Sequence, residues 1–192
     1  ISTHVCCNNI MIVGNGKSKT TILGGFYVDG KQNVKIELLS VTNDAGHGLF
    51  CTTSGTNVDV TECCFKKCQG NGMYVCEGAN VTATRCDFME NGQSGVGCNG
   101  ANTKVRLNDS TMHHNGMFGL FAGDHAVVDL HGTKTDIHSN KRHGIAAYNY
   151  ARVNIHLPSQ HNTSHDNVGE DRQQWGGGSI ANINADGTFT HT

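Results

Sequence analysis

The sequence has little of several features that would point to common classes of partner. One proline, Pro158, occurs in 192 residues, and aromatic residues make up 6%. Acidic and basic residues nearly balance, which leaves a formal net charge of −2. Without a basic excess or a basic cluster, there is no electrostatic attraction toward nucleic acid or toward an anionic membrane. Neither is therefore predicted as a partner.

Long apolar runs and helical stripes are also missing. No apolar segment approaches the roughly 20 residues that a helix needs to cross a bilayer. Apolar residues recur at every second position instead, a spacing that is typical of strands with one buried face. The sequence therefore predicts an all-β protein.

A unit of 23–25 residues repeats along the chain, and residues 80–98 are its clearest copy. The first apolar residue of the unit recurs as Ile10, Val34, Val58, Val81, Val105, Val128 and Val153. The inward positions predicted for the clearest copy are Val81, Ala83, Cys86, Phe88, Val96 and Cys98. A fixed period of this size indicates a solenoid, in which each unit buries its apolar face against its neighbours.

Three segments carry a resemblance to a known superfamily: Asn57-Val58-Asp59-Val60, Asn91-Gly92 and Ser94-Gly95-Val96. With their repeats over residues 9–184, they resemble the right-handed parallel β-helix, or pectin-lyase-like, superfamily. The resemblance implies a right-handed parallel β-helix of about seven rungs, with three short parallel sheets. It also implies that carbohydrate is a frequent ligand. The superfamily includes polysaccharide lyases, glycosidases and epimerases beside adhesins and scaffolds, so the fold does not select one function.

The predicted organisation is a single domain over residues 1–192. Residues 9–157 form regular rungs, residues 158–178 form an inserted loop, and residues 179–192 form a terminal rung or a cap. The chain begins in the middle of a rung, which predicts that it is part of a longer protein. Cysteines share columns of the repeat, where they are expected to be buried thiols rather than disulfides.

The motifs of polysaccharide-cleaving members are mostly absent. Gly46-His47-Gly48 matches one motif of the polygalacturonase-like enzymes, but the paired carboxylates of glycoside hydrolysis are not found. Charged columns alternate in sign between rungs, as in Glu62 and Arg85, which argues against a calcium site. We therefore predict no cofactor and assign no catalytic residue.

The polar segment 159–175 is the best alternative for chemistry. It contains acid–base candidates beside a tryptophan that could stack on a sugar: His161, His165, Asp166, Glu170, Asp171, Arg172 and Trp175. A polysaccharide-active enzyme would use this loop, with His143 or His165 as its base. The competing interpretation is a polar loop that caps the coil. His131 and His156 share an outward column and form a weak metal candidate, since metal sites usually have three or four ligands.

An aromatic stripe is the feature that most favours a binding function. In each repeat unit a glycine opens a second strand. The outward position of that strand is occupied, from unit to unit, by Tyr27, Phe50, Tyr74, Gly97, Phe121 and Ala146. An exposed apolar patch of this kind usually marks a contact surface. We predict a non-catalytic module that docks carbohydrate or protein along this stripe, with Trp175 as a further binding residue. The candidate protein partners include a flanking part of the same chain.

Overall fold

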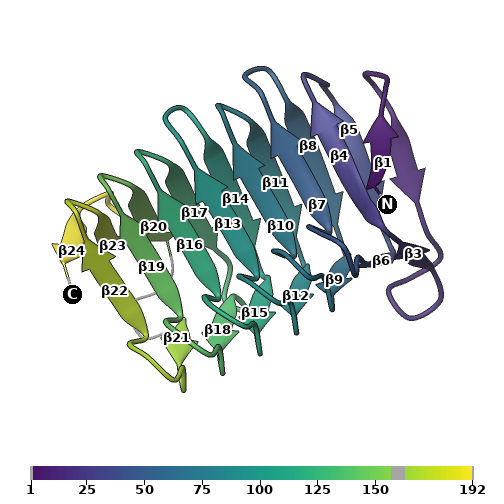
Figure 1. The fold of residues 1–192 in the computed structure, drawn as a ribbon. Coiled ribbons are helices and arrows are strands. Elements are labelled where there is room, and N and C mark those ends of the chain that lie inside the picture. The colour runs from purple at the N-terminus through teal and green to yellow at the C-terminus, as the bar shows by residue number, and fades with distance from the viewer. Residues whose placement is uncertain (1, 157–162, 192) are drawn as a thin grey trace.

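The computed structural model describes residues 2–156 and 163–191. Its regular elements in this part of the chain are all strands, and none of its described segments is a candidate membrane-spanning helix. Figure 1 shows the strands stacked rung upon rung, from the N-terminal to the C-terminal end of an elongated coil.

Three sheets run along the coil. Sheet A contains β1 (Ser2–Val5), β4 (Gly25–Asp29), β7 (Leu49–Thr52), β10 (Met73–Cys76), β13 (Val96–Asn99), β16 (Leu120–Gly123), β19 (Ile145–Tyr148) and β22 (Arg172–Trp175). Sheet B contains β2 (Met11–Val13), β5 (Val34–Glu37), β8 (Asn57–Thr61), β11 (Asn80–Thr84), β14 (Lys104–Asn108), β17 (Val127–His131), β20 (Arg152–His156), β23 (Ser179–Ile183) and β24 (Phe189–His191). Sheet C contains β3 (Thr21–Leu23), β6 (Ser40–Thr42), β9 (Cys64–Lys66), β12 (Asp87–Met89), β15 (Thr111–His113), β18 (Asp136–His138) and β21 (Ser164–His165).

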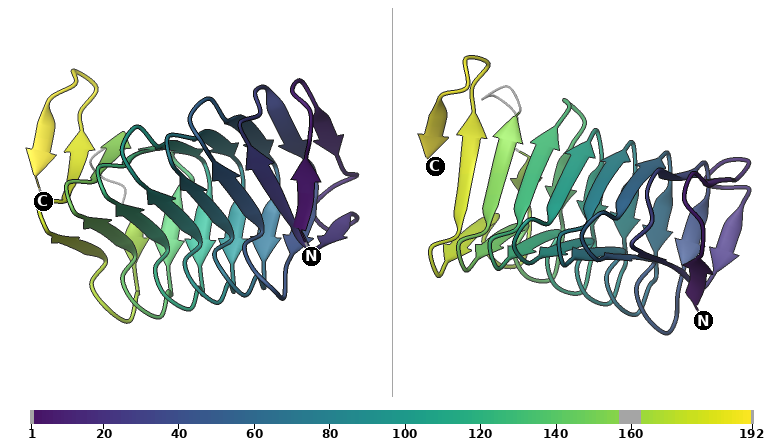
Figure 2. Two further views of the ribbon diagram at one scale, coloured as in Figure 1. Left: turned by 45° about the horizontal axis from the view of Figure 1, so that its top comes forward. Right: turned by 90° about the horizontal axis from the view of Figure 1, so that it is seen from above.

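Apart from β24, the strands pair in parallel with their equivalents on the neighbouring rungs. Strand β10, for example, lies between β7 and β13, and β11 lies between β8 and β14. Figure 2 shows the chain turning through the three sheets once per rung. This topology is the parallel β-helix with about seven rungs that the repeat predicted.

The predicted register is confirmed by the core. The six inward residues predicted for the clearest rung are all buried: Val81, Ala83, Cys86, Phe88, Val96 and Cys98. Phe65 and Phe88 stack in one column, with ring centroids 5.3 Å apart and an interplanar angle of 8°. Since a slip of one residue would turn each strand inside out, this agreement fixes which side chains face solvent.

Gly25 occupies the place of the strand-opening glycine in the first complete rung. It lies opposite Gly48, because Phe26 pairs with Leu49. A Cβ atom at Gly25 would lie 2.2 Å from the carbonyl oxygen of His47, so the backbones approach too closely for any side chain.

An asparagine ladder runs along the buried turn that follows sheet C. Asn91 donates to Asn115 at 3.0 Å, Asn115 donates to Asn140 at 2.9 Å, and Asn140 donates to Asn167 at 2.9 Å, each bond joining Nδ2 to Oδ1. One further amide pair of this kind lies before sheet B, where Nδ2 of Asn33 donates to Oδ1 of Asn9 at 2.9 Å. The ladder provides hydrogen-bond partners for backbone N–H and C=O groups that are buried in the coil.

The predicted insertion over residues 158–178 is wrong in its extent. Strand β21 pairs with β18, and β22 pairs with β19, so residues 164–165 and 172–175 belong to a regular rung. The apolar pattern is lost there because Ser164 lies opposite Ile137 and Arg172 lies opposite Ile145. Residues 157–162 lie outside the described residues. Beyond them, β23 forms a terminal rung against β20 and β24 pairs with it antiparallel.

The cysteines are free thiols, and seven of the nine are buried. Cys63 and Cys86 share an inward column of the core. Burial raises the pKa of Cys63 to about 11 and that of Cys86 to about 12. Because the thiolate is the reactive form, these two side chains act as small apolar residues of the core.

Candidate functional site

The outer face of sheet A carries the predicted aromatic row. Its register places Tyr27, Phe50, Tyr74, Gly97 and Phe121 opposite one another on successive rungs. All four rings are half-buried, because each one leans on its neighbours. Ala146 continues the row but is fully buried, and Gln173 follows it. The row therefore ends in a polar residue.

The rings of the N-terminal half contact one another from rung to rung. His4 lies 4.8 Å from Tyr27, Tyr27 lies 5.2 Å from Phe50, and Phe50 lies 5.7 Å from Tyr74, measured between ring centroids. The planes of Tyr27 and Phe50 meet at 73°. The surface is thus ridged rather than flat, as the preference of aromatic quadrupoles for edge-to-face contact explains.

His47, from the Gly46-His47-Gly48 segment, belongs to this aromatic surface. Its ring stacks on Tyr74 at 5.2 Å with an angle of 23° and lies 5.6 Å from Phe50. Its Nδ1 accepts a hydrogen bond of 2.9 Å from the backbone N–H of Asn71. Burial lowers the pKa of His47, so the neutral ring with its proton on Nε2 is favoured.

A pocket of about 290 Å³ opens where Gly97 interrupts the rings. Its walls are Asn71, Tyr74, Gln93, Ser94, Gly97, Met117, Phe118 and Phe121. A Cβ atom at Gly97 would lie 2.8 Å from Cδ2 of Tyr74. The Tyr74 ring therefore leans into the space that a side chain at Gly97 would occupy, and a larger residue there could not keep this ring position. The volume of the pocket is close to the lower limit of small-molecule sites.

Asn71 supplies a fixed polar group beside the floor of this pocket. Its Oδ1 accepts a hydrogen bond of 2.9 Å from the backbone N–H of Ser94, which orients the amide. Its Nδ2 would lie 3.4 Å from a Cβ atom on Gly97. No acceptor for this Nδ2 occurs among residues 2–156 and 163–191. The pocket thus combines aromatic walls with an oriented hydrogen-bond donor.

The rings continue on the C-terminal side of the pocket. Phe118 lies 5.5 Å from Phe121 and 5.8 Å from His143, and His143 lies 6.3 Å from Trp175. Trp175 pairs with Tyr148 across the sheet, at 5.5 Å between ring centroids. Trp175 therefore stands on sheet A beside the predicted stripe and not in a separate loop.

We use the term aromatic face for the whole set: His4, Tyr27, His47, Phe50, Tyr74, Phe118, Phe121, His143, Tyr148 and Trp175. The sequence interpretation missed five members of this surface: His4, His47, Phe118, His143 and Tyr148. His47, Phe118 and His143 each directly precede a strand-opening glycine, so a comparison of that repeat position would have found these three.

The predicted catalytic loop is divided among different faces of the coil. His165 lies on β21 of sheet C and Asp166 follows it, whereas Arg172 and Trp175 lie on sheet A. Arg172 continues an inward column opposite Ile145, and burial lowers its pKa. Its Nη1 donates to Oδ1 of Asn182 at 3.4 Å. The grouping of these candidates into one site is therefore wrong, and His161 lies outside the described residues.

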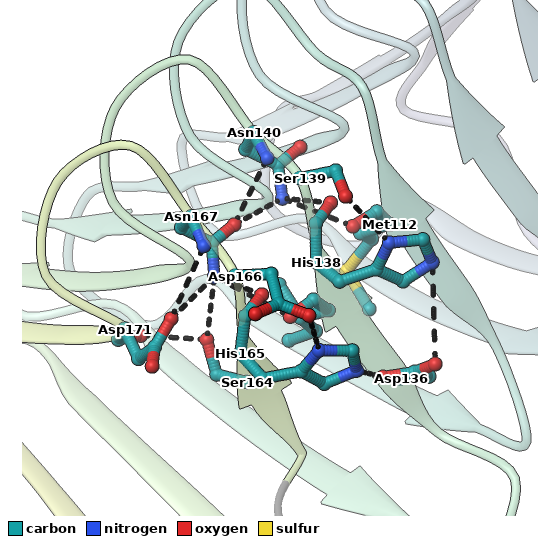
Figure 3. A network of polar contacts seen from close by, with 11 residues as sticks. Met112, Asp136, His138, Ser139, Asn140, Ser164, His165, Asp166, Asn167 and Asp171 are labelled. Carbon is teal, nitrogen blue, oxygen red and sulfur yellow. Dashed lines mark hydrogen bonds and ion pairs between the residues drawn. The ribbon is translucent and has the colours of Figure 1, made fainter.

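His165 lies between two carboxylates (Figure 3). Its Nδ1 is 2.8 Å from Oδ2 of Asp166, and its Nε2 is 3.0 Å from Oδ1 of Asp136. The hydrogen bond to Asp166 and the charge of Asp136 raise the pKa of His165. An imidazole that donates from both nitrogens has no lone pair to accept a proton, so this geometry disfavours His165 as a general base.

His143 also has a ring nitrogen that is already in a hydrogen bond. Its Nδ1 accepts a hydrogen bond of 2.9 Å from the backbone N–H of Glu170, and its ring stacks on Phe118. The Nδ1 lone pair is therefore already used, and Nε2 carries the proton of the neutral ring. His143 presents a flat ring and an N–H donor, which suits binding better than proton abstraction.

The metal candidates His131 and His156 lie face to face on the outer side of sheet B. Their ring centroids are 4.3 Å apart, and Asp129 adds a carboxylate that the sequence interpretation did not include. This cluster lies on a different sheet from the aromatic face.

Comparison with known proteins gives one result that places the chain. Residues 6–164 match the family model of the right handed beta helix region. The chain belongs to the right-handed β-helix family. No curated protein and no solved structure matched it. The match covers most of the rungs in Figure 1, and it agrees with the pectin-lyase-like resemblance of the repeat.

Membership in the β-helix family fits carbohydrate-interacting, protein-interacting and polysaccharide-active modules alike. The family match itself assigns no function to any residue, because β-helices with different functions share the coil. The function therefore has to be argued from the aromatic face and from the histidine clusters.

Proposed function

We propose that this β-helix is a non-catalytic carbohydrate-binding module whose aromatic face holds an extended glycan. In this proposal one sugar ring occupies the Gly97 pocket, and its neighbours in the chain lie against rings on the adjoining rungs. Apolar sugar faces stack on aromatic rings, while hydroxyl groups need oriented donors and acceptors.

The pocket at Gly97 is the observation that carries the proposal. Tyr74 on one side and Phe118 on the other provide ring walls, and Nδ2 of Asn71 offers a donor between them. A protein partner that simply covered an apolar patch would not need a ring-sized gap with an oriented amide. We therefore favour carbohydrate over protein as the ligand.

The test is affinity electrophoresis of the purified chain in gels that contain a panel of uronate and neutral polysaccharides. We expect retardation by at least one polysaccharide. Replacing Tyr74 with Ala should weaken that affinity by at least about 10-fold, or about 1.4 kcal/mol. Replacing Gly97 with Ala should have a similar effect, since the new methyl group occupies the pocket floor and displaces the Tyr74 ring.

Tyr150→Ala is the matched control. Tyr150 is 61% exposed and stacks on His125, outside the aromatic face. We expect its affinity to equal that of the wild type. Equal weakening by Tyr74→Ala and Tyr150→Ala, or failure of every polysaccharide to retard the wild type, would contradict the proposal.

The alternative function, a polysaccharide lyase or hydrolase, is tested on the same substrates. Assays for reducing ends and for unsaturated products should detect no turnover, because His165 donates from both ring nitrogens and the Nδ1 lone pair of His143 already accepts a hydrogen bond. Turnover that persists through purification and disappears in His165→Ala would favour the enzyme instead.

A further inference from the structure

Two clusters of the same composition lie on neighbouring sheets. Asp129-Leu130-His131 on β17 and Asp136-Ile137-His138 on β18 each point an aspartate and a histidine outward. The next rung places a second histidine beside each pair, because His131 is in register with His156 and His138 with His165. Only the first cluster brings its three ligand atoms within 4.8 Å of one another among the described residues.

The first cluster has ligand atoms available. Nε2 of His156 lies 3.0 Å from Oδ1 of Asp129. His131 stacks on His156 with an interplanar angle of 5°, and neither of its ring nitrogens has a hydrogen-bond partner within the described part of the chain. Its ring can therefore turn toward an ion without breaking a bond. Asn154 donates to Oδ1 of Asp129 at 2.9 Å and orients the carboxylate from the neighbouring rung.

The second cluster has its nitrogens occupied (Figure 3). His165 is held by Asp166 and Asp136, and Nδ1 of His138 lies 3.0 Å from the hydroxyl of Ser139. An ion would have to displace these contacts. On sheet C both histidines are thus held by hydrogen bonds, whereas on sheet B His156 contacts Asp129 and His131 has both ring nitrogens free of partners within the described residues.

We propose that Asp129, His131 and His156 bind a divalent transition-metal ion of the zinc class. Two imidazole nitrogens and one carboxylate oxygen suit Zn²⁺, whereas Mg²⁺ and Ca²⁺ prefer oxygen ligands alone. The ion takes the place of the proton between Nε2 of His156 and Oδ1 of Asp129. Their separation of 3.0 Å is close to the roughly 3.3 Å expected between ligands at tetrahedral Zn²⁺.

Such an ion would tie two successive rungs together on the outer side of sheet B. The three ligands come from β17 and β20, and a fourth position stays open to water. Arg106 lies opposite Asp129 on β14, and its positive charge opposes binding. Removing this positive charge should therefore strengthen binding of the ion, whereas removing a ligand should weaken it.

The experiment measures binding of Zn²⁺ to the metal-free chain by calorimetry, with Co²⁺ absorption as a probe of coordination geometry. We expect one ion per chain. His156→Ala and Asp129→Asn should each weaken binding by at least about 10-fold. Loss of a residue that only orients a metal ligand already costs about this much, so loss of a ligand itself should cost no less. Arg106→Gln should tighten binding. Zn²⁺ should also raise the melting temperature of the wild type, but not that of His156→Ala.

His138→Ala is the matched control, because it removes a stacked histidine of the second cluster. Its affinity for Zn²⁺ should equal that of the wild type. Circular dichroism and melting curves establish that each variant is folded, and Arg106→Gln changes no ligand. The proposal is overturned if His156→Ala binds Zn²⁺ as tightly as the wild type, if His138→Ala alone abolishes binding, or if the wild type does not bind.

Discussion

Phe88 is the residue whose position depends most directly on the register of the coil. It is fully buried and stacks on Phe65 in the column of sheet C. Replacing Phe88 with Ala removes this contact and leaves a cavity, so the free energy of unfolding should fall by about 3–5 kcal/mol. Urea denaturation measures the change.

Phe189→Ala is the control for this prediction. Phe189 is 64% exposed on β24, so its replacement should change the free energy of unfolding by no more than about 0.5 kcal/mol. Similar losses in the two variants would mean that the interior of the coil tolerates a cavity at Phe88.

His165 makes the stability depend on pH with a definite sign. Its contacts with Asp166 and Asp136 raise its pKa above the ordinary value of 6.5. A raised folded-state pKa contributes stability that is fully present below the unfolded pKa and is lost as pH rises through the folded pKa. The contribution of His165 should therefore decline as pH rises above about 6.5.

The comparison of wild type with Asp166→Asn isolates this term. Burial lowers the pKa values of His47, His113 and His131, whose contributions have the opposite sign and cancel in the difference. The stability difference between the two proteins should be largest where pH lies just below the unfolded-state pKa of histidine. It should shrink as pH rises through the raised pKa of His165. Titration of the imidazole NMR signals should place His165 above 6.5. A midpoint below that value would contradict the assignment.

At the scale of single residues, the sequence predicted whether a side chain faces the core or the solvent better than it predicted which side chains contact one another. The alternation of apolar and polar positions placed Phe88 inside and Tyr74 outside, because a strand has only two faces. It did not predict that His47 stacks on Tyr74 or that Asp129 joins His156. Those contacts depend on the side-chain conformations of residues on different rungs, and the spacing of the repeat does not determine these conformations.

The asparagine ladder is the element that shapes the turn after sheet C. Asn115 is fully buried and accepts from Asn91, and its Nδ2 donates to the carbonyl of Phe88 at 3.1 Å. Replacing Asn115 with Leu leaves several of these buried groups without partners, at about 1–3 kcal/mol each. The free energy of unfolding should fall by about 3 kcal/mol or more.

Asn57→Ala provides the comparison for the ladder, since Asn57 is exposed at the start of β8. Thermal or urea denaturation of Asn57→Ala should give a value within about 0.5 kcal/mol of the wild type. If Asn115→Leu were equally mild, water or a shifted backbone would have to satisfy the exposed groups of the turn.

The ladder and the last rung show where a pattern of apolar residues stops being informative. Asn115 can point inward because the preceding residue, His114, has a φ of 56°, which breaks the alternation of the strand. The rung at residues 163–175 has polar residues in three columns that are apolar on the preceding rung, at Ser164, Arg172 and Gln174. A search for apolar periodicity therefore reads it as a loop, although the backbone pairing continues.

The whole coil separates its candidate functions by sheet. The aromatic face lies on sheet A, the proposed metal ligands lie on sheet B, and the His165 network lies by sheet C. In a solenoid each rung contacts mainly its neighbours, so distant surface changes should be nearly additive in stability. Variants of one face can therefore be studied with the other two intact.

The length of the aromatic face leads to a prediction about the length of its ligand. Strands β1 and β22, which carry His4 and Trp175, are seven strand spacings apart, or roughly 34 Å. A monosaccharide can fill only the Gly97 pocket, whereas a longer oligosaccharide can also contact rings on other rungs. Affinity should therefore rise with oligosaccharide length until the chain spans the face.

Two variants distinguish this arrangement from a single isolated pocket. Calorimetric titration with an oligosaccharide series, taken from whichever polysaccharide retards the wild type, should show that Gly97→Ala weakens binding at every length. Tyr27→Ala should weaken only the long members, because its ring lies three rungs before Gly97. Its fold-loss should grow with length while short members bind as they do to the wild type. An affinity independent of length, or a Tyr27→Ala loss equal at all lengths, would confine the site to the pocket and contradict an extended glycan along the coil.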